Sequence, residues 1–171
     1  MKRRKTFYSI AIILLSLGIF SFQNADAQSS KKEEKNSKAA TIKQLIESKN
    51  YAFMAQSVNP LRGSTRQLTP EYDVRVLGDS LVTYLPYFGR AYTAPINSEG
   101  GIKLTTTNFD YKVQPAKKGG YDITFVPTND KDVRQLRLSV SANGYAQLQV
   151  ISNNRDAISF NGYVAALPGR K

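Results

Sequence analysis

The chain has 171 residues and a formal net charge of +11, and it contains neither cysteine nor histidine. Without cysteine there is no disulfide framework. Without either residue the usual zinc, copper and haem ligands and the Ser-His and Cys-His nucleophile pairs are excluded. The sequence therefore predicts a protein with no cofactor and no metal site, whose stability depends on its apolar core.

Residues 1–27 have the order of a secretory signal peptide. A basic leader at 2–5 precedes an apolar run of 16 residues at 7–22, and small residues stand at Ala25 and Ala27. An uncleaved membrane anchor is the alternative, but a bilayer span needs about 17–25 apolar residues. We therefore predict cleavage after Ala27 and export to the periplasm or the medium. The mature protein is expected to have no membrane span. It is not expected to be a lipoprotein, because the cysteine that lipid attachment needs is absent.

The mature protein remains basic, because the leader removes four basic residues and one acid and leaves a net charge of +8. Excess positive charge favours encounter with anionic surfaces. Outside the cytoplasm these are phospholipid, acidic glycolipid or acidic polysaccharide, and nucleic acid is not expected as a partner. The alternative is that the charge serves solubility, since the basic residues are dispersed.

The mature chain is predicted to begin with a disordered linker over 28–38, which has no apolar side chain. A helix is predicted over 39–48, where Thr41 and Gln44 fit a capping box. A second capping box upstream would let the helix begin at residue 31. The apolar stripe of the shorter helix is formed by Ile42, Leu45 and Ile46.

From residue 51 onward apolar and polar side chains alternate, which is typical of strands. The candidate strands are 51–58, 72–77, 80–85, 102–106, 108–113, 121–126, 134–141, 145–152 and 157–165. No crossover long enough for a parallel sheet separates them, so the pattern predicts an antiparallel meander. Residues 39–171 are therefore expected to form a single mainly β domain with one N-terminal helix. A small lipocalin-like barrel is favoured, and a two-sheet sandwich is the alternative.

Three turns define the register of their hairpins. Gly78-Asp79 reads as a two-residue turn, whereas 142–144 and 153–155 read as three-residue turns, the former with Gly144 in a left-handed conformation. The predicted pairs are Val76–Leu81 and Val74–Thr83, then Val140–Ala146 and Leu138–Leu148, then Val150–Ile158 and Leu148–Phe160.

Residues 85–95 interrupt the alternation. Pro86 cannot donate to a β-ladder, so the preceding strand should stop there or lie at an edge. Aromatic rings and a guanidinium then crowd together, and such groups can stack on rings, sugars or partner side chains. The candidate ligand or partner contacts are Tyr87, Phe88, Arg90 and Tyr92. Alternatively, Tyr87 or Phe88 closes the end of the barrel while Arg90 pairs with a carboxylate.

The same residues carry a family resemblance. The run 85–92, Leu-Pro-Tyr-Phe-Gly-Arg-Ala-Tyr, resembles the signature of domain-of-unknown-function family 4251, which consists of exported proteins of Gram-negative bacteria. Residues 99–102, 144–146 and 153–155 with 158–160 resemble its later motifs. The resemblance extends from about residue 48 to residue 165. It implies an exported domain without an established activity, and it assigns no catalytic or binding residue.

These observations favour a non-catalytic binding or interaction module of the cell envelope, rather than an enzyme. A hydrophobic small molecule, a glycan or a protein is the expected partner, and the oligomeric state is left open. The alternative is a carboxylate-dependent hydrolase acting on envelope glycans, which needs two carboxylates about 5–10 Å apart. Asp110 and Asp122 are the candidate pair. Asp130 and Asp132 resemble a calcium loop only weakly, because the glycine and distal glutamate of an EF-hand are missing.

Overall fold

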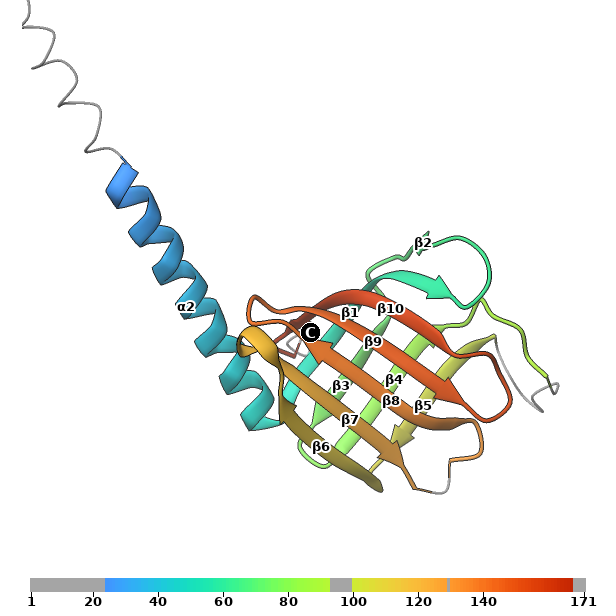
Figure 1. The fold of residues 1–171 in the computed structure, drawn as a ribbon. Coiled ribbons are helices and arrows are strands. Elements are labelled where there is room, and N and C mark those ends of the chain that lie inside the picture. The colour runs from blue at the N-terminus through green and yellow to red at the C-terminus, as the bar shows by residue number, and fades with distance from the viewer. Residues whose placement is uncertain (1–23, 93–99, 129, 168–171) are drawn as a thin grey trace, which may run out of the picture. The chain divides into compact units, whose positions relative to one another are not determined.

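The computed structural model describes residues 24–92, 100–128 and 130–167 of the chain (Figure 1). The chain divides into two compact units, residues 1–37 and 38–171. Most of the predicted signal peptide, residues 1–23, lies outside the described residues. In the part of the chain that the structure describes, no helix is both long and apolar enough to span a bilayer.

Helix α2 spans Asn24–Ser48, so it ends where predicted but begins well before residue 39. Residues 28–38, predicted as a disordered linker, are helical, and the described side chains from Glu33 to Lys38 are exposed. The prediction went wrong because it weighed the missing apolar side chains and not the many lysines and glutamates, which favour helix. Glu34 and Lys38 also stand four residues apart, where opposite charges stabilise a helix.

All nine predicted strands are present, with ends shifted by at most two residues. The sequence pattern missed β2, because two residues carry no periodicity. The strands are β1 Asn50–Pro60, β2 Arg66–Gln67, β3 Asp73–Leu77, β4 Ser80–Pro86, β5 Gly101–Thr106, β6 Phe109–Pro115, β7 Tyr121–Pro127, β8 Val133–Val140, β9 Tyr145–Ser152 and β10 Ile158–Ala165. A single turn of 3-10 helix, η1 (Lys117–Gly119), joins β6 to β7.

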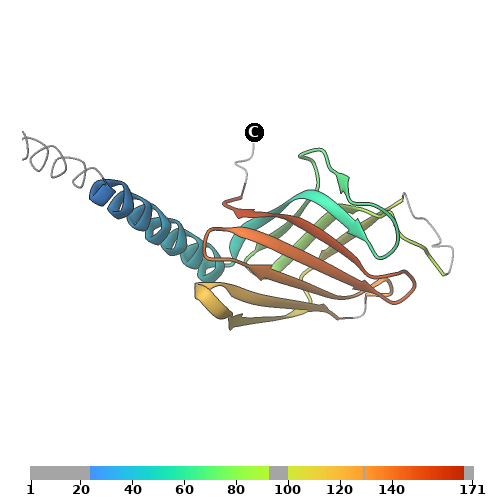
Figure 2. The ribbon, with the colours of Figure 1, turned by 45° about the horizontal axis from the view of Figure 1, so that its top comes forward.

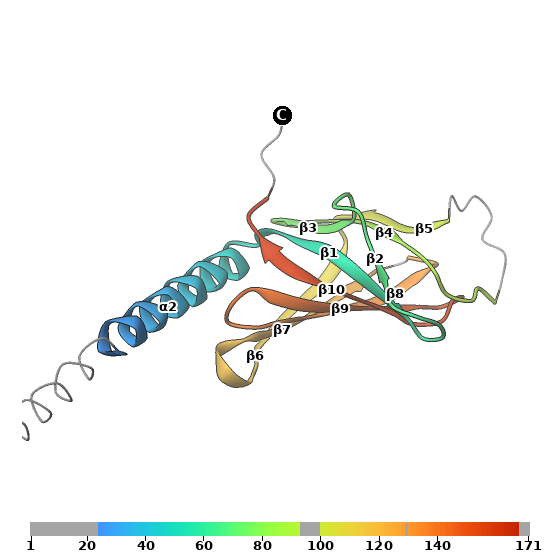
Figure 3. The same ribbon diagram turned by 90° about the horizontal axis from the view of Figure 1, so that it is seen from above.

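One antiparallel sheet contains all the strands, in the order β5-β4-β3-β1-β10-β9-β8-β7-β6, with β2 paired to β1. The sheet curls on itself, so that β3, β4 and β5 face β6, β7 and β8 across the interior (Figures 2 and 3). The predicted barrel is therefore confirmed, and it is nearly closed, since no ladder joins β5 to β6 among the described residues. The sandwich alternative is wrong, because a single hydrogen-bonded path connects every strand.

The predicted hairpin registers are confirmed. The observed pairs include Val76–Leu81 and Val74–Thr83, Val140–Ala146 and Leu138–Leu148, and Val150–Ile158 and Leu148–Phe160. Gly144 has a φ of +89°, as the three-residue turn requires. Local turn chemistry and alternation are enough to set these pairs, because a slip of one residue would turn the apolar face outward.

Large apolar side chains occupy the barrel interior. Its largest fully buried members are aromatic and aliphatic residues that include Tyr51, Phe53, Phe125 and Phe160. Ile42 and Ile46 of helix α2 belong to the same apolar cluster, so the last turns of the helix cover one opening of the barrel. Each such side chain stabilises the fold by roughly 1.5–3 kcal/mol when fully buried.

Candidate binding site at the polar end of the barrel

The segment after β4 runs along the turn between β9 and β10. As predicted, β4 ends at Pro86. Ala91 then pairs with Arg155 in an isolated antiparallel bridge. The N–H of Tyr92 donates to the carbonyl of Asn154 at 2.9 Å, and the N–H of Asp156 donates to the carbonyl of Arg90 at 3.0 Å. We call this region, residues 85–92 and 153–156 with Gly101 and Asp132, the polar end of the barrel.

Arg155 is the centre of the polar end, and it is only 8% exposed. Its Nη2 lies 2.9 Å from Oδ2 of Asp132, and its Nη1 donates to the carbonyl of Gly101 at 3.0 Å. The guanidinium also lies over the ring of Tyr87, with Cζ 5.1 Å from the ring centroid. One side chain therefore joins the segment after β4, the first residue of β5, the loop before β8 and the turn after β9.

Tyr87 is half-buried and supports this network through its hydroxyl group. Its hydroxyl lies 2.9 Å from the carbonyl oxygen of Arg90 and 3.1 Å from that of Asp156, so one proton serves two acceptors. Burial raises the pKa of the Tyr87 hydroxyl, and the negative charge of Asp156 adds to the rise. The ring folds back over Gly89, where a Cβ atom would lie 2.3 Å from the Tyr87 hydroxyl oxygen. Only glycine leaves room for this arrangement.

The remaining predicted residues of the segment face solvent. Phe88 is 39% exposed and Tyr92 is 65% exposed. The guanidinium of Arg66, from β2, lies 4.8 Å from the centroid of the Phe88 ring. Such a cation–ring contact is worth about 0.5–1 kcal/mol at an exposed site.

The Tyr92 hydroxyl donates to Oδ1 of Asp156, and this bond raises the pKa of Tyr92. The positive charges of Arg62 and Arg90 act in the opposite direction and lower it. The side chains of Arg62, Arg66 and Arg90 are all exposed. We call the surface formed by these arginines with Phe88 and Tyr92 the basic aromatic patch.

The four predicted contact residues therefore come together but have different roles. Tyr87 supports the network from inside, as the alternative interpretation expected, whereas Phe88, Arg90 and Tyr92 are exposed. The expected pairing of Arg90 with a carboxylate is wrong for the described residues, since the ion-paired arginine of the polar end is Arg155. Sequence reasoning also missed two arginines of the patch, Arg62 and Arg66. They lie in a loop and a two-residue strand, where no pattern marks them.

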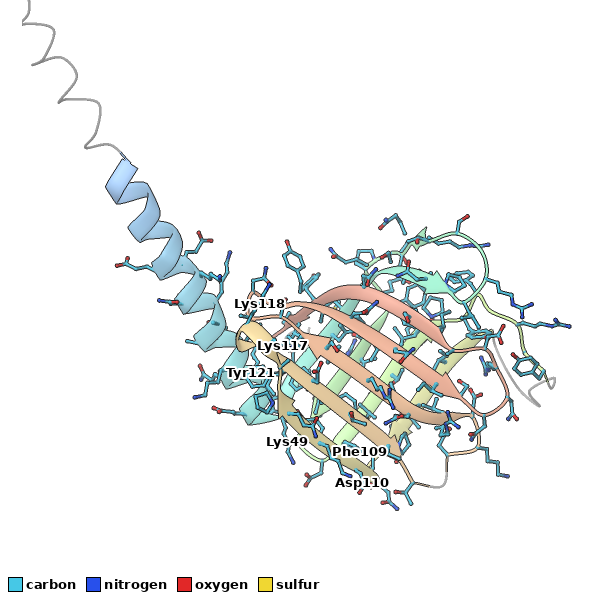
Figure 4. The ribbon with its side chains drawn as sticks, viewed as in Figure 1. Lys49, Phe109, Asp110, Lys117, Lys118 and Tyr121 are labelled. Atoms are coloured by element: carbon cyan, nitrogen blue, oxygen red, sulfur yellow. The ribbon has the colours of Figure 1, made fainter. Side chains whose placement is uncertain are left out.

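The predicted acidic pair does not form a catalytic site. Asp110 is opposite Val126, whereas Asp122 is opposite Gln114, four residues further along β6. That spacing is about 13 Å along a strand. In Figure 4 Asp110 lies toward the start of β6, whereas Tyr121, the neighbour of Asp122, lies beside η1. The carboxylate of Asp122 instead accepts a hydrogen bond of 2.6 Å from Ser139 Oγ.

The weak calcium-loop pattern also has a structural explanation. One carboxylate oxygen of Asp130 accepts hydrogen bonds from the N–H groups of Asp132 and Val133, which stabilises the turn before β8. Asp132 pairs with Arg155. Among the described residues there is no group of three or more acidic side chains placed to hold a metal ion.

Comparison with known proteins places the chain in a family. The sequence profile of the family "Domain of unknown function (DUF4251)" matches residues 33–164. The chain belongs to this family. A crystal structure of a DUF4251 family protein from Bacteroides eggerthii DSM 20697 is similar, with a TM-score of 0.56 and 18% sequence identity, over 78% of this chain and 88% of that chain. This similarity shows a shared DUF4251 fold. No curated protein matches the chain.

Three of the motifs that carry the resemblance to DUF4251 proteins meet at the polar end. Residues 85–92 and 153–155 pair at the polar end, and Gly101, from the motif at 99–102, accepts the Arg155 hydrogen bond. The motif at 144–146 lies at the opposite end of β9, where Gly144 approaches Ile42 of helix α2. The motif residues of this DUF4251 domain thus include those that close the two ends of its barrel.

Proposed function

We propose that this DUF4251 protein is an exported, non-catalytic binding module of the Gram-negative cell envelope. It contacts an acidic polysaccharide through the basic aromatic patch. The observation that carries the proposal is the grouping of three exposed arginines with two exposed rings, in which the buried network holds in place the loop that carries Phe88, Arg90 and Tyr92. Loops braced in this way lose little conformational entropy on binding.

The large side chains in the interior favour contact at the surface over an enclosed hydrophobic ligand. A barrel of about eight strands has room for packed side chains or for one small ligand. Here Tyr51, Phe53, Phe125 and Phe160 occupy the interior and have 0% exposure. The hydrophobic small molecule considered from the sequence is therefore less compatible with this fold than a partner outside the barrel.

The chemistry of the patch favours an acidic sugar polymer. Arginine matches the planar geometry of a carboxylate, and an aromatic ring offers a flat apolar face on which a sugar ring can pack. The carboxylate of Asp156 adjoins the patch, but the residue is only 7% exposed and accepts the hydrogen bond of Tyr92. An incoming anion therefore meets mainly the guanidinium groups.

Export is supported by the order of basic leader, apolar run and small residues at 1–27. Mass spectrometry of protein recovered from the periplasm and the medium tests this part. The expected mature N-terminus is Gln28. Recovery of the intact leader in the membrane fraction would contradict it.

Binding is tested by affinity electrophoresis of the full chain in gels that contain polygalacturonate. The double variant Arg62→Ala/Arg90→Ala should bind roughly tenfold more weakly, because two exposed charge contacts are lost. The matched control is Arg134→Ala/Arg137→Ala, which removes the same charge from exposed positions of β8 and should bind like wild type. Added salt should weaken the wild-type interaction.

Equal retardation of the two double variants would reject the patch, because net charge alone would then explain the binding. No retardation of wild type would reject the acidic polysaccharide as partner. Binding to vesicles of anionic phospholipid but not to polygalacturonate would reject it as well, and would identify a membrane surface instead.

A further inference from the structure

The outer face of the barrel carries a continuous row of polar side chains across neighbouring strands. In the ladders Asp122 of β7 is opposite Ser139, Ser139 is opposite Gln147, and Gln147 is opposite Asn161 of β10. All four side chains are exposed. Gln56, at the irregularity in β1 opposite Asn161 and Gly162, extends the row to a fifth strand.

A shallow, open groove follows this row. Its volume is about 530 Å³, and its lining includes Gln56, Asp122, Ser139, Tyr145, Gln147 and Asn161. Tyr145 is 66% exposed, and its cross-strand partner Tyr163 is 38% exposed. Two tyrosine rings thus stand on the outer face beside a line of amide and hydroxyl groups.

The chemistry of the groove is that of a surface for sugar hydroxyl groups. A side-chain amide both donates and accepts hydrogen bonds, as a sugar hydroxyl does. The only formal charge in the row belongs to Asp122, and the Ser139 hydroxyl already donates to it at 2.6 Å. The groove therefore complements a neutral polyhydroxylated chain, in contrast to the arginines of the basic aromatic patch.

The spacing of the row favours a polymer over a single sugar. Neighbouring strands lie about 4.8 Å apart, which is comparable with the advance of one sugar residue in an extended polysaccharide. The row crosses β7, β8, β9, β10 and β1, so that it extends over about 19 Å. Successive sugar residues of one extended chain could therefore meet successive strands.

We propose that this groove binds a segment of neutral polysaccharide lying across the strands, with one sugar ring packed on Tyr145. The assignment is independent of the basic aromatic patch. The patch lies on the loops after β1 and β4, beside the turn between β9 and β10, whereas the groove adjoins the turn between β8 and β9.

The test is an NMR titration of the isotope-labelled full chain with cellohexaose, maltohexaose and chitohexaose, and with glucose as a length control. At least one hexasaccharide should shift the backbone amide signals of residues 139–147 and 161, and glucose should bind far more weakly. Tyr145→Ala should reduce the affinity about five- to tenfold. Gln147→Ala should reduce it by a smaller factor.

Tyr84→Ala is the matched control, since Tyr84 is a tyrosine of β4 with 43% exposure, on the other side of the barrel. Its affinity should equal that of wild type, and thermal unfolding checks that each variant is folded. Absence of shifts with all three hexasaccharides, shifts confined to other surfaces, or unchanged affinity of Tyr145→Ala would each overturn the proposal. The double variant Arg62→Ala/Arg90→Ala should retain wild-type affinity here, which separates this test from that of the proposed function.

Discussion

The two ends of the barrel are closed by different kinds of interaction. At the polar end the buried guanidinium of Arg155 joins Asp132 and the Gly101 carbonyl. At the other end, which we call the helix end, residues 38–48 of helix α2 and the hairpin turn 141–144 come together. There Ile42 and Ile46 enter the apolar core, with 6% and 2% exposure.

This difference explains why the two ends correspond to different kinds of sequence pattern. Hydrogen bonds and ion pairs are directional, so the polar end needs particular residues in several loops at once. Apolar packing needs only suitable volume and shape, so the helix end needs little more than a spaced stripe of aliphatic residues. The long run at 85–92 reflects the first requirement, and the short stripe of helix α2 reflects the second.

The largest effect is expected from removing the centre of the polar end. Arg155→Met should lower the free energy of unfolding by about 3 to 4 kcal/mol, because it leaves the Asp132 carboxylate and the Gly101 carbonyl without their partner. Urea unfolding measures the loss. Adding Asp132→Asn to this variant should restore part of it by removing the unpaired charge. A loss below about 0.5 kcal/mol would show that the network is not structural.

At the helix end Ile46→Ala should lower the free energy of unfolding by about 2 to 3 kcal/mol, because the side chain is 2% exposed and its removal leaves a cavity. The same urea measurement applies. Glu47→Ala, at an exposed position of the same helix, is the control and should change little. If Ile46→Ala were equally harmless, the contact between the helix and the barrel would contribute nothing to stability.

Gly144→Ala should lower the free energy of unfolding by about 1 to 2 kcal/mol, because a φ of +89° strains any residue with a Cβ atom. The new Cβ would also lie 3.0 Å from Cδ1 of Ile42. Combining it with Ile42→Ala separates the two causes. In the double variant the crowding disappears while the backbone strain remains. The losses of unfolding free energy of the two single variants should therefore sum to more than the loss of the double variant. Strict additivity would show that Gly144 and Ile42 do not interact.

Alkaline pH should destabilise the barrel through its buried tyrosines. Burial raises the pKa of Tyr51, and the neighbouring Tyr111 hydroxyl, 3.2 Å away, adds to the rise. Burial also raises the pKa of Tyr111. The unfolded chain loses these protons near pH 10 while the folded chain keeps them. Stability is therefore complete below pH 10 and falls above it, by about 1.4 kcal/mol per pH unit for each proton.

The check is the slope of unfolding free energy between pH 9 and pH 11. Tyr51→Phe should reduce that slope in this interval. An unchanged slope would mean that Tyr51 ionises in the folded chain as readily as in the unfolded one.

The smallest effect is expected for the other arginine of the polar end. Arg90→Ala should change the unfolding free energy by less than about 0.5 kcal/mol, since its side chain is exposed and only its backbone carbonyl serves the network. Thermal and urea unfolding of Arg90→Ala and Arg155→Met, measured side by side, compare the two variants. A cost approaching that of Arg155→Met would mean that the two arginines share the structural role assigned here to one.

Local patterns were sufficient for most of the fold. The strands from β3 to β10 and their hairpin registers follow from alternation and turn residues that are close together in the chain, such as Gly78 and Gly144. The early start of helix α2 was also encoded locally, in its lysines and glutamates. It was missed because the absence of apolar residues was taken to mean disorder.

The candidate site could be predicted only in part. The segment 85–92 stands out by composition, and three of its predicted contacts, Phe88, Arg90 and Tyr92, are exposed as a contact surface requires. Which arginine is buried could not be read from the chain, because Arg90 and Arg155 are equally polar and burial depends on what surrounds each side chain.

By itself the sequence determined an antiparallel β domain with one docked helix, because alternation, turn conformation and capping act over a few residues. Only the tertiary structure decided that β1 pairs with both β3 and β10, that the distant segments 85–92 and 153–156 form one end of the barrel, and that Arg66 lies against Phe88 there. Those contacts depend on the closure of the sheet. Closure brings together residues whose separation along the chain carries no local signal.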